Sequence, residues 1–417
     1  MLIGFDASRA FVSQPTGTEN YSYQLLKAFA KLDCQQRFCL YLRPNQNISE
    51  ADRSWLPKGW KIKIIPWDYF WTQGGLALET WQNPMDVLFI PAHVIPFLKN
   101  PKVPVVTTAH DLPLEFFPHQ KTLIQRIYLN RWVENLRARL AAKIIAVSMA
   151  TKKDLIEKLG VPESKIKVVH EGVEYENIKY QIVASQDSLR NTNIKDTDQK
   201  NASRDSSRNA KMNEIRKKYG VEGDYFLFVG TIHPRKNLIR LIEAFGCFVR
   251  SAFPSAGGPL AELQLILVGR LGWDYQGILD SPQKLGIGNQ VKFLNYVDLA
   301  DLPYLYAGSL ALVYPSLYEG FGLPILEAYS AGTLVLTSNI SSMPEVGGSE
   351  AIYVNPFDVL DIERGLRDAW EINQKPEIRL AKIGKGREWA KGFTWEKTAQ
   401  QTLEVLNQSV NLKGLGS

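Results

Sequence analysis

Short runs of β-branched and aromatic residues alternate with helix-length segments along almost the whole chain. Such near-continuous apolar strands, separated by helices, are typical of parallel sheets that are covered on both faces. In the first half the predicted strands are residues 2–7, 37–43, 61–67, 86–92, 103–110, 143–148 and 166–173. In the second half they are residues 225–232, 263–269, 291–297, 311–316, 333–339 and 351–356. The alternation therefore predicts an α/β fold with two Rossmann-like, doubly wound parallel-sheet domains.

A polar stretch in the middle of the chain separates the two sets of strands. At 417 residues the chain is too long for one ordinary core. Residues 183–212 are almost all Ser, Asn, Asp, Gln, Lys and Arg, with too few apolar groups to form a core. We predict a first domain over 1–180, a disordered polar insertion or linker over 181–214, and a second domain over 215–390. The remaining segment, 391–417, is predicted to be a helix that returns to the first domain.

Charge and cysteine content limit the class of protein. Lys and Arg number 49 against 43 Asp and Glu, a net charge of +6. This mild excess does not indicate nucleic acid, but it suits anionic small molecules or an acidic membrane face. Cys34, Cys39 and Cys247 have neither a CxxC pair nor the spacing of a disulfide framework. No apolar run approaches the roughly 20 residues of a membrane span, so we expect a cytoplasmic protein. From the mild charge excess we expect that it binds no nucleic acid.

Two glutamates flank an apolar turn in the stretch YPSLYEGFGLPILEAYSAG, residues 314–332. Pro324 suits the first turn of a helix that ends at Gly332, so Glu319 lies in the loop before it and Glu327 in its first turn. The loop therefore follows a parallel strand, where open α/β sheets bind ligands. Carboxylates accept hydrogen bonds from vicinal diols, which indicates a sugar ligand. The alternative is a capping glutamate plus a surface glutamate.

Two cations lie where a helix is expected to begin. The stretch FVGTIHPRKNL, residues 228–238, runs from a strand into a helix and places Arg235 and Lys236 at or near its first turn. Cations are unfavourable at a helix N-terminus unless an anion is also present. A diphosphate would bind both cations and the helix amides through charge-assisted hydrogen bonds. The alternative is that both side chains are solvated surface charges.

Two further positions follow strands of the first half. Gly17 precedes a predicted helix at the place where a Rossmann domain carries its phosphate loop, but no GxGxxG is present, which argues against a dinucleotide cofactor. His110 stands at the carboxyl end of the strand 103–110. The alternative for this histidine is a buried structural role.

Taken in order, these motifs resemble glycosyltransferase family 4. The resemblance covers nearly the whole chain. It depends on the TGTENY loop, the HDL after a strand, the VGTIHPRKNL segment, the E-x7-E of YEGFGLPILEA and the closing FTWEKTAQQTLEVL. It implies a retaining enzyme of the GT-B fold, whose two Rossmann-like domains face each other across a cleft. The first would be the acceptor-side domain and the second the nucleotide-sugar-binding domain. The subgroup resembles bacterial mannosyl- and rhamnosyltransferases.

The resemblance also implies a role for each motif residue. Glu327 would bind the ribose hydroxyls of the nucleotide, and Arg235 and Lys236 would bind the diphosphate. Glu319 would face the transferred sugar. The other donor contacts would be the backbone amides of Phe321, Gly322 and Leu323, with Gly17 allowing close approach from the other domain and His110 near the reacting carbon.

One position departs from the family pattern. Many relatives carry an arginine directly after the glycine of the phosphate segment, where this chain has Thr231. We expect Arg235 to supply that charge instead.

These expectations define an activity and two rivals. The predicted protein is a metal-independent retaining hexosyltransferase with no cofactor and a nucleotide diphosphate sugar as co-substrate. It would move a mannose-like, rhamnose-like or glucose-like sugar to a glycan or lipid-linked acceptor in surface polysaccharide or glycolipid synthesis. The rivals are a sugar-nucleotide epimerase and a non-catalytic nucleotide-sugar-binding protein.

A basic amphipathic segment, residues 121–143, suggests peripheral contact with an anionic membrane. Its apolar residues recur at helical spacing and its cations greatly outnumber its single acid, Glu134. These are the properties of an interfacial anchor at the inner face of a membrane. The alternative is a helix that packs its apolar face on the sheet and leaves a solvated basic face.

Overall fold

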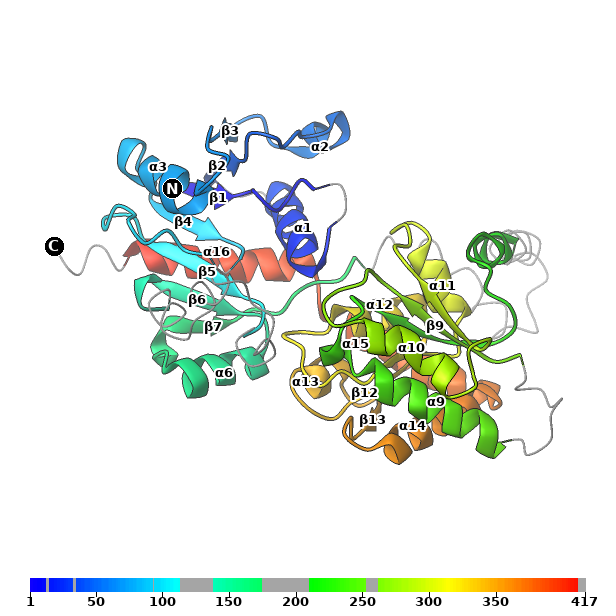
Figure 1. Ribbon diagram of the computed structural model, residues 1–417. Coiled ribbons are helices and arrows are strands. Elements are labelled where there is room, and N and C mark those ends of the chain that lie inside the picture. The colour runs from blue at the N-terminus through cyan, green and yellow to red at the C-terminus, as the bar shows by residue number, and fades with distance from the viewer. Residues whose placement is uncertain are drawn as a thin grey trace, which may run out of the picture. The chain divides into compact units, whose positions relative to one another are not determined.

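The computed structural model (Figure 1) describes residues 1–12, 15–32, 35–92, 94–112, 138–174, 210–252 and 262–411. The chain divides into two compact units. The N-terminal unit comprises Met1–Gly172 with Thr394–Ser417, and the C-terminal unit comprises Val173–Phe393.

The N-terminal unit is built on a parallel sheet of seven strands in its described part. Their order is β3-β2-β1-β4-β5-β6-β7. The neighbouring pairs are all parallel. The strands are β1 (Leu2–Asp6), β2 (Arg37–Leu42), β3 (Lys61–Ile64), β4 (Val87–Ile90), β5 (Val105–Ala109), β6 (Lys143–Ala146) and β7 (Ile166–Val168). The order reverses between β1 and β4, as in a Rossmann fold.

Helices cover both faces of this sheet, which explains why its central strands β1, β4 and β5 are buried on both sides. One face packs its core against α1 (Gly17–Lys31) and α16 (Trp395–Asn411). The other packs against η1 (Trp71–Leu76) and α6 (Met149–Leu159). The remaining described elements of this unit are α2 (Glu50–Trp55), α3 (Ala77–Gln82) and η3 (Glu163–Lys165).

The C-terminal unit repeats the architecture with six parallel strands among its described residues. Their order is β10-β9-β8-β11-β12-β13, which reverses between β8 and β11. The strands are β8 (Tyr225–Val229), β9 (Gln264–Val268), β10 (Val291–Leu294), β11 (Ala311–Tyr314), β12 (Leu334–Ser338) and β13 (Ile352–Val354). Around them lie η5 (Pro234–Lys236), α9 (Leu238–Ala252), α10 (Gln276–Lys284), α11 (Leu302–Gly308), α12 (Leu323–Ala331), α13 (Met343–Gly347), α14 (Val359–Asn373) and α15 (Pro376–Ala390). Helix α9 packs on α14, and α12 packs on α15.

The structure confirms the predicted fold class, since each predicted strand contains one observed strand. The last helix, α16, packs on α1 in the N-terminal unit. Residues 210–214, which we assigned to a disordered linker, are instead helical and belong to a helix over 210–219. The rest of the predicted linker, 181–209, and most of the basic segment 121–143 lie outside the described residues.

Candidate active site

Two loops meet where the strand order of the C-terminal unit reverses. One follows β8 and the other follows β11, and these strands are neighbours although β9 and β10 lie between them along the chain. A hydrogen bond from the amide of Leu317 to the carbonyl of Arg235, at 2.9 Å, joins the loops. Open parallel sheets bind ligands outside the carboxyl ends of their strands at this kind of switch point.

The first loop begins with a close approach of two backbones. A β-carbon placed on Gly269, at the end of β9, would lie 1.9 Å from the carbonyl oxygen of Gly230, at the end of β8. Only a glycine therefore allows the two strand ends to come together there. This contact sets the path of the chain towards Arg235 and Lys236.

Arg235 and Lys236 lie in the short 3-10 turn η5, which ends just before α9 begins at Leu238, so they lie near the helix start as the sequence predicted. Asn237 separates this turn from the helix and adopts a left-handed conformation, with φ of 60°. Its side-chain amide donates hydrogen bonds to the carbonyls of Pro315, at 3.1 Å, and Pro356, at 2.6 Å. The asparagine therefore ties the loop of the two cations to the loop of Glu319.

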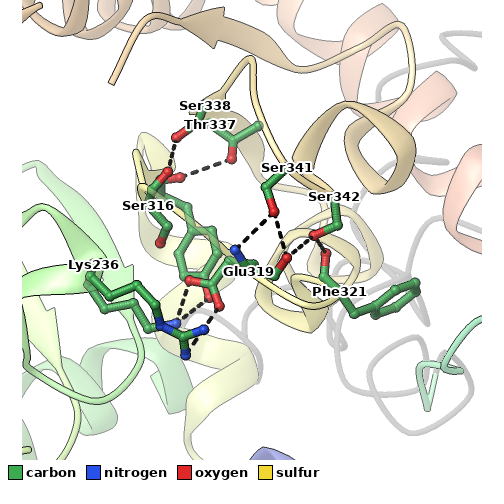
Figure 2. Close-up of polar contacts among 10 residues, drawn as sticks. Lys236, Ser316, Glu319, Phe321, Thr337, Ser338, Ser341 and Ser342 are labelled. Carbon is green, nitrogen blue, oxygen red and sulfur yellow. Dashed lines mark hydrogen bonds and ion pairs between the residues drawn. The ribbon is translucent and has the colours of Figure 1, made fainter. Parts of the chain in front are cut away.

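Glu319 forms a buried ion pair with Lys236. Lys236 Nζ lies 2.5 Å from Glu319 Oε1 and 2.9 Å from the hydroxyl of Tyr314. A guanidinium nitrogen of Arg235 lies 4.0 Å from Glu319 Oε2. The two partners of the pair, Lys236 and Glu319, are each only 6% exposed. Figure 2 shows the carboxylate of Glu319 directed towards Lys236.

The charges around Glu319 determine its ionisation. Burial alone would raise the pKa of this carboxyl, but Lys236 and Arg235 lower it from 4.5 to about 2. The carboxylate is therefore ionised throughout the physiological range. Two cations and one anion give this cluster a net positive charge, which favours a further anion nearby.

Two serines hold the backbone around Glu319 (Figure 2). Ser341 Oγ accepts from the Glu319 amide at 3.2 Å and donates to its carbonyl at 2.7 Å. Ser342 Oγ lies 3.0 Å from the Glu319 carbonyl oxygen and 2.6 Å from that of Phe321. Ser341 has a φ of 58°. Non-glycine residues in this conformation are strained and concentrate at functional sites, so the serine pair supports a functional role for this loop.

Helix α12 begins directly after this loop. Gly322 occupies its N-cap with a φ of 108°, a conformation that a glycine adopts without the steric cost of a β-carbon. Leu323 is the first helical residue, and Phe321 is buried just before the cap. The first amides of a helix lack intrahelical acceptors and carry a partial positive charge. The backbone here is therefore suited to oxygen atoms of a ligand.

Glu327 has a different partner from Glu319. It is the fifth residue of α12, so it lies one turn later than the sequence indicated. Its carboxylate accepts a hydrogen bond from the hydroxyl of Tyr306, on α11, at 2.8 Å. The two glutamates are thus held separately, one by cations and one by a phenol.

His110 follows β5 in the N-terminal unit, and protein acceptors flank its ring. Its Nδ1 lies 3.1 Å from Glu171 Oε1, and its Nε2 lies 2.9 Å from the carbonyl oxygen of Pro91. Burial lowers the pKa of His110, but Glu171, the Pro91 carbonyl and Asp111 together raise it above its ordinary value. Because both ring nitrogens face acceptors, these contacts favour the protonated ring over the neutral one.

Gly17 is the first residue of α1, whose N-cap Thr16 forms a capping box with Glu19. A β-carbon built on Gly17 would meet no atom within 4 Å. The fold itself therefore does not demand a glycine there. One turn later, Tyr21 packs edge-on against His110 with ring centroids 4.6 Å apart, so this helix and His110 are neighbours.

Sequence reasoning missed several residues that hold the site. They are Glu171, Asn237, Tyr306, Tyr314, Ser341 and Ser342. For Asn237 the residue type itself was informative, because asparagine is enriched among the non-glycine residues that adopt a left-handed conformation. The others showed none, since their partners lie far away in the sequence.

The described ranges contain neither a metal-binding group nor a membrane-spanning helix. No group of three or more His, Cys, Asp or Glu side chains there could hold a metal ion. None of the helices described there has the length and apolar character needed to cross a bilayer.

Two family models match the chain. Residues 15–177 match "Glycosyltransferase Family 4", and residues 211–388 match "Glycosyl transferases group 1". Together these segments take in most of the chain, and both descriptions name glycosyltransferases. The second segment includes Arg235, Lys236, Glu319 and Glu327.

The chain is also similar in sequence to individual proteins named as mannosyltransferases. O-antigen chain mannosyltransferase B of Escherichia coli is 37% identical over 43% of this chain and 45% of its own length. O-antigen chain mannosyltransferase RfbU of Salmonella typhimurium is 27% identical over 68% of this chain and 64% of its own length. These curated relatives are thus matched over less than two-thirds of their length.

Among solved structures, HepE from Anabaena, in complex with UDP and glucose, superposes with a TM-score of 0.68. The sequence identity is 18%, and the match covers 97% of this chain and 99% of that one. At this identity the likeness establishes the fold alone. The family models therefore assign a Family 4 glycosyltransferase segment to the first half of the chain and a group 1 glycosyltransferase segment to the second, and the fold is GT-B.

Proposed function

We propose that this protein is a retaining, metal-independent hexosyltransferase. It moves a mannose-like, rhamnose-like or glucose-like sugar from a nucleotide diphosphate sugar to a glycan or lipid-linked acceptor in surface polysaccharide or glycolipid synthesis. The observation that carries this proposal is the buried cluster of Arg235, Lys236 and Glu319 at the switch point of the C-terminal sheet. The mannosyltransferase names of the relatives support the sugar class, and the UDP in HepE supports a nucleotide sugar.

The cluster supplies what departure of a nucleoside diphosphate requires. When the bond from the anomeric carbon to the diphosphate oxygen breaks, negative charge grows on the departing phosphate. Lys236 and Arg235 are fixed cations that stabilise this charge without reorganisation. The amides at the start of α12 add a partial positive charge nearby. No metal ion takes part in this proposal.

The remaining residues bind and orient the donor. Glu319 accepts hydrogen bonds from the transferred sugar, and Glu327 from the ribose diol, because carboxylates accept from adjacent hydroxyls. Phe321, Gly322 and Leu323 contribute backbone amides. Gly17 gives a ligand unobstructed access to the start of α1, which its open surroundings support. We place His110, whose ring nitrogens face Glu171 and the Pro91 carbonyl, near the reacting carbon.

The activity test is a donor screen. UDP-, GDP- and dTDP-sugars are each incubated with and without lipid-linked acceptors, and nucleotide release is measured. We expect release that depends on acceptor, a product with the anomeric configuration of the donor, and no loss of rate in excess chelator. Acceptor-independent conversion of the donor into an epimer would establish the epimerase instead, and binding without turnover would establish a binding protein. A chelator-induced loss that magnesium restores would refute the metal-independent mechanism.

We also propose that the protein works in the cytoplasm, at the inner face of an anionic membrane. Large apolar side chains are exposed in two segments of the N-terminal unit: Tyr69 (84%) and Phe70 (72%) between β3 and α3, and Leu98 (79%) between β4 and β5. Trp81, on α3, donates to the carbonyl of Leu98 at 2.9 Å, which places these two side by side. Aromatic side chains of this kind suit the membrane–water interface.

Vesicle sedimentation tests the membrane proposal. We expect binding that increases with anionic lipid content and weakens in high salt, and that falls in the variant Tyr69→Ser/Phe70→Ser. The control Phe357→Ser removes an aromatic that is 61% exposed from the C-terminal unit and should bind like wild type. Binding that ignores lipid charge, or none at low salt, would refute the proposal.

A further inference from the structure

Tyr306 holds the carboxylate of Glu327 from a neighbouring helix. Its hydroxyl lies 2.8 Å from Glu327 Oε2. The tyrosine is only 1% exposed, and burial raises its pKa far above the ordinary value, so the phenol keeps its proton and donates to the carboxylate. A hydrogen bond of this kind, from a buried neutral donor to an ionised acceptor, is among the stronger ones in proteins.

The backbone of Tyr306 is also anchored beside α12. Its carbonyl oxygen accepts from Thr333 Oγ1 at 2.6 Å and from Ser309 Oγ at 2.8 Å. Thr333 directly follows Gly332, the C-cap of α12. The same residue therefore contacts the α12 region twice, with its side chain in the middle of the helix and with its backbone just beyond the end. This double attachment fixes the position of the phenol relative to Glu327.

A free glutamate side chain populates several rotamers, and ordering it for a ligand costs conformational entropy. The Tyr306 hydrogen bond holds one oxygen of the carboxylate in the absence of ligand and so reduces the number of side-chain conformations left to order. Each carboxylate oxygen can accept more than one hydrogen bond. The phenol therefore orients the group without using up its capacity to accept from a diol.

We propose that Tyr306 is a positioning residue that orients Glu327 for the vicinal diol of a ribonucleotide. This inference rests on the proposed function, in which Glu327 binds the ribose. It adds a residue on α11, a helix that carries none of the family motifs. The other role for the same bond is to join α11 to α12 without effect on the ligand.

Ligand variants separate the two roles. Calorimetric affinities are measured for UDP and GDP and for their 2′,3′-dideoxy analogues, with the wild type, Tyr306→Phe, Glu327→Gln and the control Tyr304→Phe. Tyr304 lies on the same helix, α11, two residues earlier. The ratio of ribo to dideoxy affinity reports the diol contact, whereas a general weakening of the unit would affect both ligands equally.

We expect the wild type to prefer the ribonucleotide and Glu327→Gln to lose most of that preference. Tyr306→Phe should lower the preference by about threefold to tenfold, the size of one hydrogen bond, and leave the dideoxy affinity unchanged. Tyr304→Phe should behave as wild type. Thermal melts of all four proteins check that they are folded.

Three outcomes would overturn the inference. If Glu327→Gln loses the preference while Tyr306→Phe keeps it, the phenol is structural and the proposed function stands. If Tyr306→Phe weakens both ligands equally, or does not fold, the hydroxyl serves stability alone. If Glu327→Gln retains the full preference, the ribose role of Glu327 is wrong, and the inference fails with that part of the proposed function.

Discussion

Replacing Lys236 by methionine tests the buried ion pair most directly. Methionine keeps the length of the side chain but removes the charge that lies 2.5 Å from Glu319. The carboxylate would then stay buried, with only the Arg235 guanidinium left as a counter-charge, 4.0 Å away. An uncompensated buried charge is one of the few single changes that destabilise a protein strongly.

The size of the effect follows from the ionisation of Glu319. Its pKa falls from 4.5 to about 2 in the folded chain, and this shift corresponds to about 3 kcal/mol of stabilisation. Lys236 is the largest cause that lowers this pKa, and in the variant the desolvation cost of Glu319 remains. We therefore expect the variant to lose about 3–5 kcal/mol of unfolding free energy at neutral pH.

The loss should depend on pH in a defined direction. In the wild type the folded pKa is lowered, so the stabilisation is present above pH 4.5 and is lost as the pH falls towards 2. In the variant the carboxyl remains buried and its pKa rises above the unfolded value. The destabilisation caused by this buried carboxylate is then relieved as the pH falls towards the pKa that Glu319 has in the unfolded chain. The stability gap between the two proteins should therefore shrink between about pH 7.5 and about pH 4.5.

Urea unfolding of the full chain at these two pH values measures the gap. The double variant Lys236→Met/Glu319→Gln removes both charges and should recover most of the loss, which isolates the pair. The control Lys385→Met removes a 71% exposed lysine 4.0 Å from Glu350 in the same unit. It should change the stability by less than about 1 kcal/mol. A variant as stable as wild type at neutral pH, or a loss that is equal at both pH values, would refute the reasoning.

Two further predictions concern other parts of the chain. Glu171→Gln should lower the pKa of His110, because the Glu171 carboxylate raises it in the native protein. The stability that this pair contributes is present below the unfolded histidine pKa and is lost as the pH rises through the raised folded pKa, so the variant should be weakened more at pH 6 than at pH 9. An NMR titration of the His110 ring measures the shift, and an unchanged midpoint would contradict it. Deletion of residues 185–209 should leave folding and donor turnover nearly unchanged, because their composition cannot form a core. A large fall in soluble yield or turnover would show that the segment has a structural role.

The sequence was sufficient to predict the strands and the fold class. A strand buried on both faces needs an apolar run, and a helix between such strands needs an amphipathic one, so both signals are local. Glycine signals were local too, as at Gly332, which ends α12 with a φ of 79°. The positions of Glu319 and Glu327 relative to the helix could be predicted to within one turn for the same reason.

Only the tertiary structure determined which side chains meet. Lys236 and Glu319 are separated by 83 residues. They touch because β8 has β9 as its neighbour on one side and β11, a strand much later in the chain, on the other. Tyr306 reaches Glu327 only because α11 packs on α12. Strand order and helix packing arise from the burial of the whole sheet, which no single segment of sequence records. The charged residues of each motif could therefore be identified from the sequence, but the side chains that they contact could not.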